Sequence, residues 1–513
     1  MRVNGFAPDG LVDAVLAYEA ALMADDVEAL DALFAPGDET LRGDAAGLLV
    51  GHDAIAAFRR GRGGAPKRRL LRLEVRAIDD DNALVVAVVE PLTGGRGQQT
   101  QLWRRDHGGL GWVVRAAHVS APTSAIQRAV WRVVGDPLIA PTGSGTLDGE
   151  TVAVKDLYNL AGWKVGVGNP TFLAEATPAS TTAPAVAALL AAGASVRGIV
   201  QTDEFAYSIA GANAHYGTPP NPAVPGGLPG GSSSGPASAV AQGQATIGLG
   251  TDTAGSIRVP ASYNGLWGLR TTHGAVPLDG VWPLAPSFDT VGWLTRDART
   301  LRRAAEESLP AGVTMPAIFV VSSRLLAVAS DDARDAFQQK VDDLSAYGNE
   351  IADLDLGDPD QLVETFRVVQ AAEAWRSDGD WVTTHPGATG PGVRERFEIA
   401  SQITAEQEGA ARDAMASHRA RLDELLGDRV LLIPSAAGAA PSATADAATL
   451  DLVRAATLRL GSVANLTGRP ALSVPILTVP GPFGGDAPLG LCLVGPRGSD
   501  LVLIEIAESL IAQ

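Results

Sequence analysis

The first 120 or so residues carry two successive patterns of hydrophobic positions. The first pattern has the spacing of one helix face and predicts a long amphipathic helix or a broken pair, with apolar positions Leu11, Val12, Val15, Leu16, Leu22, Met23, Val27, Leu30, Leu33 and Phe34. The second pattern predicts four strands, at Leu70–Ile78, Ala83–Glu90, Gln98–Arg105 and Trp112–Val119. Helix followed by a sheet meander is typical of a small α+β domain, which we place at residues 1–122.

A different pattern begins at Leu147 and continues to Gln513. Short apolar strands alternate with helices, as in a layered α/β sheet. The clearest strands are Thr151–Val154, Ser195–Gln201 and Val430–Ile433, and the clearest helices are Thr181–Ala192, Ser238–Gln242, Asp332–Ala346 and Thr449–Asn465. The segment Asp353 to Pro391 shows no clear period, and we expect irregular structure there that covers one face of the sheet.

The two patterns are separated by a junction, which we place at residues 123–146. It holds a short helix pattern and then residues that interrupt secondary structure, namely Pro137, Pro141, Gly143 and Gly145. The second domain then spans residues 147–513. The length of 513 residues agrees with two or more domains, because single hydrophobic cores rarely grow to that size.

Composition and charge narrow the class of protein. With 46% hydrophobic and 19% charged residues, the chain has the composition of a globular protein. The net charge of −18 repels phosphate groups and argues against nucleic acid or an anionic membrane as a partner. A local basic run is either a solvated face or a docking site for an anion or a partner; it comprises Arg59, Arg60, Arg62, Lys67, Arg68, Arg69, Arg72 and Arg76.

Cysteine usage and the N-terminal segment bear on the compartment. Cys492, the one cysteine, excludes an intrachain disulfide and most cysteine-based metal sites, and it fits a reducing compartment. The first ten residues have no basic region followed by an apolar one, as a signal peptide would. We therefore expect a cytoplasmic protein. The charge-free stretch Phe205 to Thr251 contains too many Gly, Pro, Ser and Asn residues to span a membrane and predicts buried soluble structure.

Lys155 is the first candidate for chemistry, because it ends the apolar strand Thr151–Val154. A lysine buried there loses hydration of its charged form, which lowers its pKa and makes it a usable general base. The alternative is a lysine that extends from the strand end and pairs with Asp156.

Two loops rich in small and hydroxyl-bearing residues are the second and third candidates. The first, Pro229 to Gly235, contains three successive serines before a helix of small residues. It lacks the lysine of a phosphate-binding loop. The second, Gly248 to Ser262, places Ser256 behind small residues, as a nucleophile on a tight turn would be. The pattern is not G-x-S-x-G, and a lysine base fits better than a Ser-His-Asp triad.

These motifs resemble the amidase signature family. The matching segments are Val152–Asp156, Gly230–Gly235 and Gly250–Ala261, and two C-terminal segments, Asn465–Pro475 and Leu489–Pro496, extend the similarity over about residues 147 to 513. The resemblance implies an α/β/α sandwich with a mixed central sheet. In this family the bridging serine lies 24 positions before the nucleophile, which selects Ser232 as the partner of Ser256.

The resemblance also implies a role for each motif residue. Ser256 attacks the amide carbonyl, Ser232, which follows a cis peptide bond, relays protons, and neutral Lys155 is the base. The backbone N–H groups of Thr253, Ala254, Gly255 and Ser256 hold the oxyanion. Ala254 stands where many members have glycine. No metal or organic cofactor is implied, and the partner is a small-molecule amide substrate.

Within the family, Ala206–Pro219 and Ser262–Arg270 resemble the indole-3-acetamide hydrolase branch. By family position we expect the substrate to be bound by Phe205, Tyr207, Ser208 and Ser233. We interpret His215 and His273 as structural. Arg258 either meets a substrate carboxylate or pairs with Asp252, and the ion pair is the preferred interpretation. Trp282 and Phe288 are further candidates for the lining of the pocket.

The N-terminal region resembles the AtzH-like domain, a member of the NTF2-like (SnoaL-like) cones. The similarity rests on Arg96–Trp103 and Gly111–Ser120. We expect a structural, regulatory or dimerising role, with ligand binding as the alternative. A homodimer is therefore a possible state of the protein.

Taken together, the sequence predicts an amidohydrolase that converts a small acyl or aryl-acyl amide to a carboxylate and ammonia or an amine through an acyl-enzyme. The alternative enzyme is a carboxybiuret- or allophanate-type hydrolase. A glutaminase-like subunit of a tRNA-dependent amidotransferase is a third hypothesis, against which the acidic charge and the N-terminal domain argue.

Overall fold

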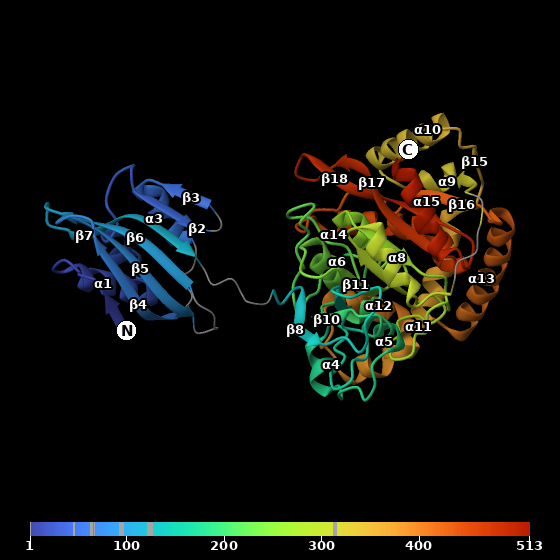
Figure 1. Ribbon diagram of the computed structural model, residues 1–513, viewed down its shortest axis with the longest axis horizontal. Coiled ribbons are helices and arrows are strands. Elements are labelled where there is room, and N and C mark those ends of the chain that lie inside the picture. The colour runs from blue at the N-terminus through green and yellow to red at the C-terminus, as the bar shows by residue number, and fades with distance from the viewer. Residues whose placement is uncertain are drawn as a thin grey trace. The chain divides into compact units, whose positions relative to one another are not determined.

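The chain forms two compact units, Met1–Gln127 and Arg128–Gln513. The computed structural model describes residues 2–44, 47–61, 65, 67–91, 97–120, 127–310, 315 and 317–512. Figure 1 shows the first unit in blue and cyan and the second from cyan to red. Arg62, Arg96 and residues 123–126, on which parts of the sequence analysis rest, lie outside the described residues.

In its described residues, the first unit is a seven-stranded sheet with three helices. Its helices are α1 (Leu11–Ala24), α2 (Val27–Ala32) and α3 (His52–Gly61). Its strands are β1 (Arg2–Asn4), β2 (Leu41–Asp44), β3 (Gly47–Val50), β4 (Arg68–Ala77), β5 (Asn82–Pro91), β6 (Gly97–Asp106) and β7 (Gly111–Ser120). The meander β4 to β7 coincides with the four predicted strands, and the α+β class is confirmed.

The N-terminal helical pattern forms a broken pair. Asp25 adopts a left-handed conformation (φ 58°) after α1, and the side chain of Asp26 accepts a hydrogen bond from Ala29 N to begin α2. Leu11 and Val15 of α1 share a core with Trp103 of the sheet.

The basic run is not uniformly solvated. Arg59 is buried and binds the carbonyl of Leu30 and the carboxylate of Asp31. Arg68 forms an ion pair of 2.7 Å with Glu19. The expectation of a solvated face is wrong at these two residues, because both guanidinium groups form ion pairs with acidic side chains of the same unit.

The second unit contains an eleven-stranded sheet of order β15-β14-β16-β18-β17-β12-β13-β11-β9-β10-β8. The strands are β8 (Trp131–Ile139), β9 (Thr151–Lys155), β10 (Ser195–Val200), β11 (Ile247–Thr251), β12 (Trp267–Arg270), β13 (Val291–Thr295), β14 (Phe319–Val321), β15 (Ile351–Asp353), β16 (Val430–Pro434), β17 (Ala471–Pro480) and β18 (Asp486–Val494). Strand β9 runs parallel to β10 and β11, whereas β11 and β13 are antiparallel, so the predicted mixed sheet is confirmed.

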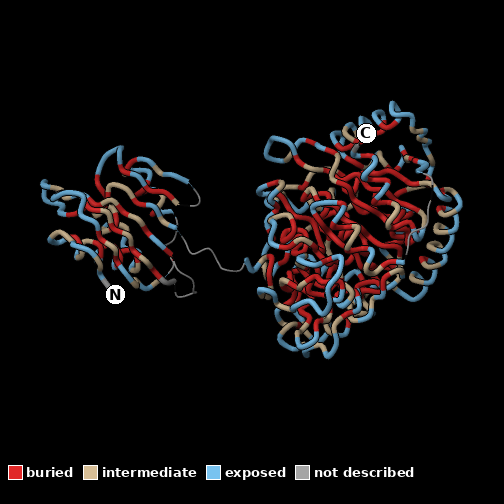
Figure 2. Tube along the Cα trace, viewed as in Figure 1, coloured by how far each residue is buried: buried red, intermediate tan, exposed pale blue. Residues whose placement is uncertain are grey.

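Helices surround this sheet. They are α4 (Pro170–Glu175), α5 (Pro184–Ala191), α6 (Ser234–Ala241), α7 (Arg258–Asn264), α8 (Ala298–Glu306), α9 (Ser323–Leu326), α10 (Asp331–Ala346), α11 (Pro359–Thr384), α12 (Pro391–Ser401), α13 (Ala405–Leu426), α14 (Ala447–Thr467) and α15 (Asp500–Ala512), with a short 3-10 turn η1 (Glu204–Ala206). Figure 2 shows the strands of this unit as mostly buried and the outer helices, such as α13, as largely exposed.

In its described part, residues 127–146, the predicted junction contains a strand and no helix. Strand β8 pairs antiparallel with β10 at the sheet edge. Val130 and Trp131 pack against Ala153 and Val200, and through these contacts the segment is part of the second unit. Pro137 is tolerated because an edge strand leaves one row of backbone groups unpaired. The second unit accordingly begins at Arg128, earlier than the predicted residue 147.

The segment Asp353 to Pro391 is mostly one long helix, α11, and the expectation of irregular structure is wrong. The side chain of Asp358 caps it by accepting a hydrogen bond from Asp360 N. Polar side chains are buried in the helix beside the apolar ones and break the hydrophobic period. They are Thr365, Gln370, Glu373 and Asp378.

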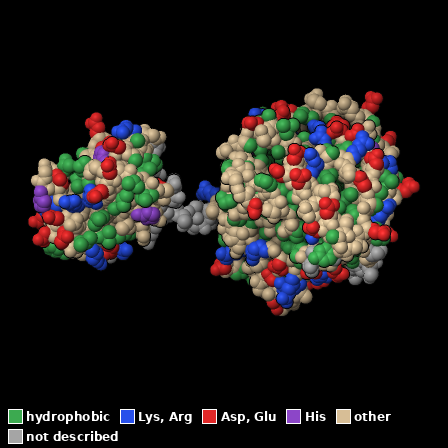
Figure 3. Space-filling view, turned by 90° about the horizontal axis from the view of Figure 1, so that it is seen from above, with side chains coloured by type: hydrophobic (Ala, Val, Ile, Leu, Met, Phe, Trp, Pro, Cys, Tyr) green, Lys and Arg blue, Asp and Glu red, His purple; other side chains and the backbone are tan. Residues whose placement is uncertain are grey.

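Among the helices in the described ranges, none is long and apolar enough to cross a membrane. On the face of the second unit shown in Figure 3, acidic and basic side chains are interspersed.

Candidate active site

Lys155 lies at the end of β9 with no exposed surface. Its neighbours β10 and β11 cover both edges of the strand. Asp156, the alternative partner for this lysine, instead forms an ion pair of 2.9 Å with Arg132. The interpretation of Lys155 as a strand-end lysine paired with Asp156 is therefore wrong.

The Lys155 Nζ is surrounded by three hydroxyl groups. It lies 2.8 Å from Ser232 Oγ, 3.1 Å from Ser233 Oγ and 2.8 Å from Thr251 Oγ1. Burial lowers the pKa of Lys155 to about 7, although the carboxylates of Asp203, Asp252 and Asp289 act in the opposite direction. Near neutral pH the amine is thus divided between its charged and neutral forms.

The loop before α6 holds Ser232 by contacts to a neighbouring loop. The backbone carbonyl of Ser232 accepts hydrogen bonds from Asp203 N (3.1 Å) and from the Thr202 hydroxyl (3.0 Å). The peptide bond between Gly231 and Ser232 is cis, as the family resemblance implies. A side chain at Gly231 would collide with the buried Asp203 carboxylate, which favours glycine at this position.

The loop between β11 and α7 is organised by the buried carboxylate of Asp252. It accepts hydrogen bonds from the backbone N–H groups of Ile257 and Arg258 and forms ion pairs with Arg258 (2.8 Å) and Arg270 (3.1 Å). Burial would raise the pKa of Asp252, but the two guanidinium groups hold it well below its usual range. The preferred pairing of Arg258 with Asp252 is confirmed.

Four consecutive N–H groups in this loop have no acceptor among the described residues: those of Thr253, Ala254, Gly255 and Ser256. The left-handed conformation in this run falls on Gly255 (φ 137°), and Ala254 has an ordinary φ. The alanine methyl group therefore does not strain the turn.

Ser256 is 2% exposed, and its carbonyl accepts a hydrogen bond of 3.2 Å from Ser233 N. This bond joins the two loops. Within the described part of the chain, no hydrogen bond connects the hydroxyls of Ser232 and Ser256. The structure thus brings Lys155 and Ser232 into direct contact and places Ser256 on the adjoining loop.

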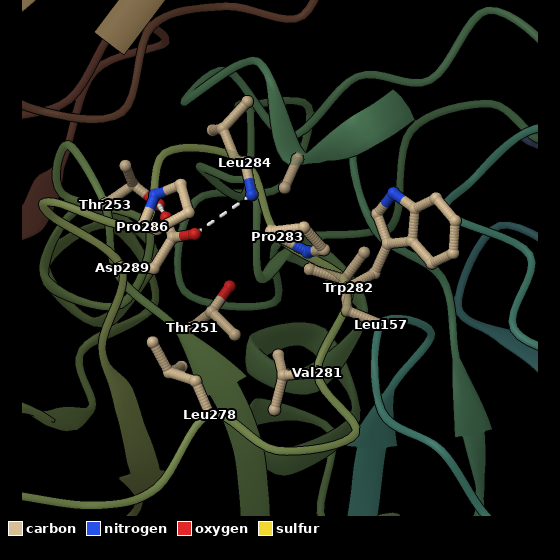
Figure 4. A pocket seen from close by; sticks show the side chains of 11 residues that line it. Leu157, Thr251, Thr253, Leu278, Val281, Trp282, Pro283, Leu284, Pro286 and Asp289 are labelled. Carbon is tan, nitrogen blue, oxygen red and sulfur yellow. Dashed lines mark hydrogen bonds between the residues drawn. The ribbon is translucent and has the colours of Figure 1, made fainter. Parts of the chain in front are cut away.

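Three adjoining cavities lie beside these loops, and Ser256 lines the middle one. We call them the chamber, the neck and the mouth. The chamber, of about 120 Å³, is lined by Leu157, Ala206, Thr251, Thr253, Leu278, Val281, Trp282, Pro283, Leu284, Pro286 and Asp289. Figure 4 shows these side chains around it and the hydrogen bond from Leu284 N to Asp289.

The neck, of about 10 Å³, is lined by Ala206, Tyr207, Ser208, Ile209, Ala254, Ser256, Leu284, Gln370, Arg454 and Leu458. The mouth, of about 520 Å³, lies between α11, α12 and α14. Ala206 and Leu284 line both chamber and neck, and Tyr207, Gln370, Arg454 and Leu458 line both neck and mouth. The three cavities therefore follow one another, with Ser256 at the narrowest point.

The structure places the predicted substrate-binding residues in different surroundings. Tyr207 and Ser208 line the neck beside Ser256. Phe205 lines none of the three cavities, because its ring packs among those of Phe172, Trp381 and Phe397. Ser233 also lies outside them, and its hydroxyl donates to the carbonyl of Thr251 while contacting Lys155.

The remaining predicted residues are placed as follows. Trp282 lines the chamber, whereas Phe288 is buried against Phe366. His215 binds the Glu204 carboxylate (2.7 Å), and His273 binds the carbonyl of Pro286. Both histidines have structural partners, as interpreted from the sequence.

Sequence reasoning missed several residues of the site. Thr251 supplies the third hydroxyl on Lys155, and its position at the end of a strand beside the Ser256 motif was the available signal. Asp203 also went unnoticed, although an acid in an otherwise buried stretch is a signal in itself. Within the described ranges, no group of three or more His, Cys, Asp or Glu side chains could hold a metal ion.

Comparison with protein families matches both units. The model described as Amidase matches residues 135–310, and the model described as AtzH-like matches residues 9–125.

Known proteins agree with this assignment. Amidase 1 of Oryza sativa subsp. japonica is 36% identical over 405 residues, which cover 72% of this chain and 92% of the relative. The 2-amino-5-chloromuconic acid deaminase of Comamonas testosteroni is 34% identical over 389 residues, which cover 72% of this chain and 83% of the deaminase. A solved structure described as a crystal structure of amidase superposes with a TM-score of 0.66 at 28% identity and covers 75% of this chain and 92% of its own. The chain belongs to the amidase family and is an enzyme of that hydrolase class.

Proposed function

We propose that the protein hydrolyses a small acyl or aryl-acyl amide to a carboxylate and ammonia or an amine, with Ser256 as nucleophile, Ser232 as relay and Lys155 as base. One observation carries this proposal: the fully buried amine of Lys155, with a pKa of about 7, lies 2.8 Å from the Ser232 hydroxyl. The loop of Ser232 is hydrogen-bonded to the loop of Ser256. A base poised near neutral pH is what general base catalysis requires.

The hydrogen-bond inventory around the amine supports the direction of the relay. A neutral amine has two N–H donors and one lone pair. The Ser233 hydroxyl uses its proton on the Thr251 carbonyl (3.2 Å) and so accepts from Lys155. The lone pair is then free to accept the proton of Ser232, whose own oxygen can take the proton of Ser256.

The reaction proceeds in two halves. Ser256 Oγ attacks the carbonyl carbon while its proton passes to Ser232 and the Ser232 proton passes to Lys155. The intermediate collapses, the C–N bond breaks, and the leaving nitrogen takes a proton back through Ser232. Water then attacks the ester on Ser256 by the same relay and releases the carboxylate.

The free N–H groups of residues 253–256 are suited to the oxyanion of both intermediates. Such a donor contributes about 3 kcal/mol to the transition state. Because the ion pairs of Asp252 fix this loop before substrate binds, the donors need no reorganisation. The chamber of about 120 Å³, with Trp282 in its wall, suits a small acyl or aryl group.

The test is a panel of amides assayed for ammonia release with the wild type, Ser256→Ala and Lys155→Ala. We expect both variants to fold and to lose turnover by at least about a thousandfold. Ser417→Ala and Lys340→Ala serve as matched controls, because both side chains bind only backbone carbonyls on outer helices. Retained turnover in Ser256→Ala would refute the mechanism.

The same panel separates the other candidates. Preference for carboxylated ureas over simple amides would favour the carboxybiuret- or allophanate-type hydrolase, and a requirement for glutamine and tRNA would favour the amidotransferase subunit. We further propose that the AtzH-like unit is an NTF2-like cone with a structural or dimerising role and that the protein is cytoplasmic. Light scattering on the full chain tests the homodimer.

A further inference from the structure

Two arginines without ion-pair partners line the mouth. Arg396 lies on α12 and Arg454 on α14, and both helices pack against α11. Among the described residues, neither guanidinium group forms a hydrogen bond or an ion pair. The other two arginines of the mouth are paired, Arg367 with Glu364 at 3.3 Å and Arg459 with Asp360 at 2.6 Å.

Arg454 is the more confined of the two. Its Nε atom is fully buried without a partner. Burial lowers the pKa of Arg454 to about 10, and the charges of Arg396 and Arg367 act in the same direction. The acidic side chain of Asp451 attracts both Arg454 and Arg396 without forming an ion pair with either. A partly buried guanidinium group without a counter-charge is costly to a fold, so this arrangement favours a bound anion.

The other polar groups at the neck-mouth boundary suit an anion as well. The side chains of Tyr207 and Gln370 line both cavities and are each 7% exposed. Neither side chain forms a hydrogen bond with another described residue. The phenol and the amide are hydrogen-bond donors that line the same boundary as Arg454. A planar guanidinium binds a carboxylate through two parallel hydrogen bonds, which favours a carboxylate over a spherical anion.

We infer that the amide substrate carries a carboxylate, which binds in the mouth to Arg454 and Arg396, while its reacting carbonyl lies at Ser256. This inference rests on the proposed function. Arg454 lines the neck together with Ser256, so a group bound to Arg454 belongs to the molecule whose carbonyl occupies the neck. The chamber, on the other side of Ser256, has mostly apolar walls and accommodates an uncharged part of the substrate.

The inference predicts a preference between substrates of equal length. N-acetylglycine, N-acetyl-β-alanine and N-acetyl-4-aminobutyrate, which carry the carboxylate on the amine side, are compared with N-ethylacetamide, N-propylacetamide and N-butylacetamide, which replace the carboxylate with a methyl group. Hydrogen bonds to a charged group predict that kcat/KM is about 10- to 100-fold higher for the best carboxylate than for its neutral counterpart. Equal or better turnover of the neutral amides would overturn the inference and leave the proposed function intact.

Substitution identifies the residues responsible. Arg454→Leu and Arg396→Leu should remove the preference by raising KM for the carboxylate substrates much more than for the neutral amides. Arg454→Lys should retain part of it. Arg394→Gln is the matched control, because Arg394 lies on the same helix as Arg396 and is exposed near Glu398. An equal loss for charged and neutral amides in Arg454→Leu would overturn the inference.

A stability measurement distinguishes binding from a structural role. If Arg454 serves a ligand, Arg454→Leu should keep or raise the melting temperature, because a desolvated charge is removed. A lower melting temperature together with an unchanged preference would contradict the inference.

Should no amide be turned over, the proposed function fails, and glutarate then serves as the binding probe for the mouth. Stabilisation of the wild type by glutarate that is lost in Arg454→Leu would support the carboxylate site independently. Equal behaviour of the two proteins would overturn it.

Discussion

The titration of Lys155 makes a quantitative prediction for the pH dependence of turnover. Only the neutral amine can accept the proton of Ser232. With a pKa of about 7, the neutral fraction is about 9% at pH 6 and about 91% at pH 8. We therefore expect kcat/KM to rise about tenfold between these values and then to level off. An ordinary lysine would give a rise of about a hundredfold over the same range, continuing to about pH 10.

The assay is initial-rate release of ammonia at constant ionic strength, with substrate well below KM. A profile that still rises with unit slope above pH 9, or that is flat from pH 6 to 8, would refute the assignment of Lys155 as the base. Burial raises the pKa of Asp378, which binds Trp282 of the chamber, to about 7 as well. Asp378→Asn is therefore the control, and the rising limb should persist in it.

A second variant tests whether the amine of Lys155 causes the rise of kcat/KM with pH. Thr251→Val preserves shape and removes an oxygen 2.8 Å from Lys155 Nζ. The ammonium form loses more from this change than the neutral amine, because hydrogen bonds to charged groups are stronger. The break in the profile should move to lower pH by about half a unit to one unit. A break that does not move would mean that another group sets it.

Three further predictions concern stability and specificity. Because burial lowers the pKa of Lys155, this residue binds a proton in the unfolded chain but not in the folded protein between pH 7 and the usual lysine pKa, so wild-type stability rises with pH in that window. The free energy of unfolding of Lys155→Met, relative to wild type, should therefore fall by about 1.4 kcal/mol per pH unit from pH 7 to 10, as measured by urea unfolding. Asp252→Asn leaves Arg258 and Arg270 without a counter-charge and should cost about 3–5 kcal/mol, which thermal or urea unfolding would detect against the wild type. Trp282→Ala enlarges the chamber and should shift kcat/KM toward amides with longer acyl groups; unchanged ranking of the amides would show that the chamber does not hold the acyl group.

The sequence predicted those parts of the site that depend on local order along the chain. Lys155 was recognisable as a charged residue ending a buried strand, and Ser256 as a serine behind small residues. The resemblance to the amidase signature family then selected Ser232 by its interval from Ser256. The layered α/β architecture followed from the alternation of strands and helices, and the mixed sheet from the resemblance to the amidase signature family. Phe205 was misplaced because an apolar side chain near a site fits a pocket wall and a core equally well, and only the packing with Phe172 and Phe397 decides between them.

What the sequence could not supply are properties that arise from segments far apart in the chain. The neck joins Ser256, Gln370 of α11 and Arg454 of α14, and no local pattern relates these residues. In α11 the buried polar residues, of which Gln370 lines the neck, obscured the helix itself, since they interrupt its apolar face. Functional residues are therefore the ones most prone to mislead a prediction based on hydrophobic periodicity.

The pKa of Lys155 follows the same logic. Desolvation lowers it, and the carboxylates of Asp203, Asp252 and Asp289 raise it, so its value reflects a balance among four buried groups. Arg258 and Arg270 neutralise Asp252 and thereby weaken its pull on the lysine. The two arginines take no part in the amide chemistry, but by neutralising Asp252 they favour a pKa of Lys155 near neutrality. If they were lost, Asp252 would act on Lys155 unopposed and favour the ammonium, which cannot accept a proton from Ser232.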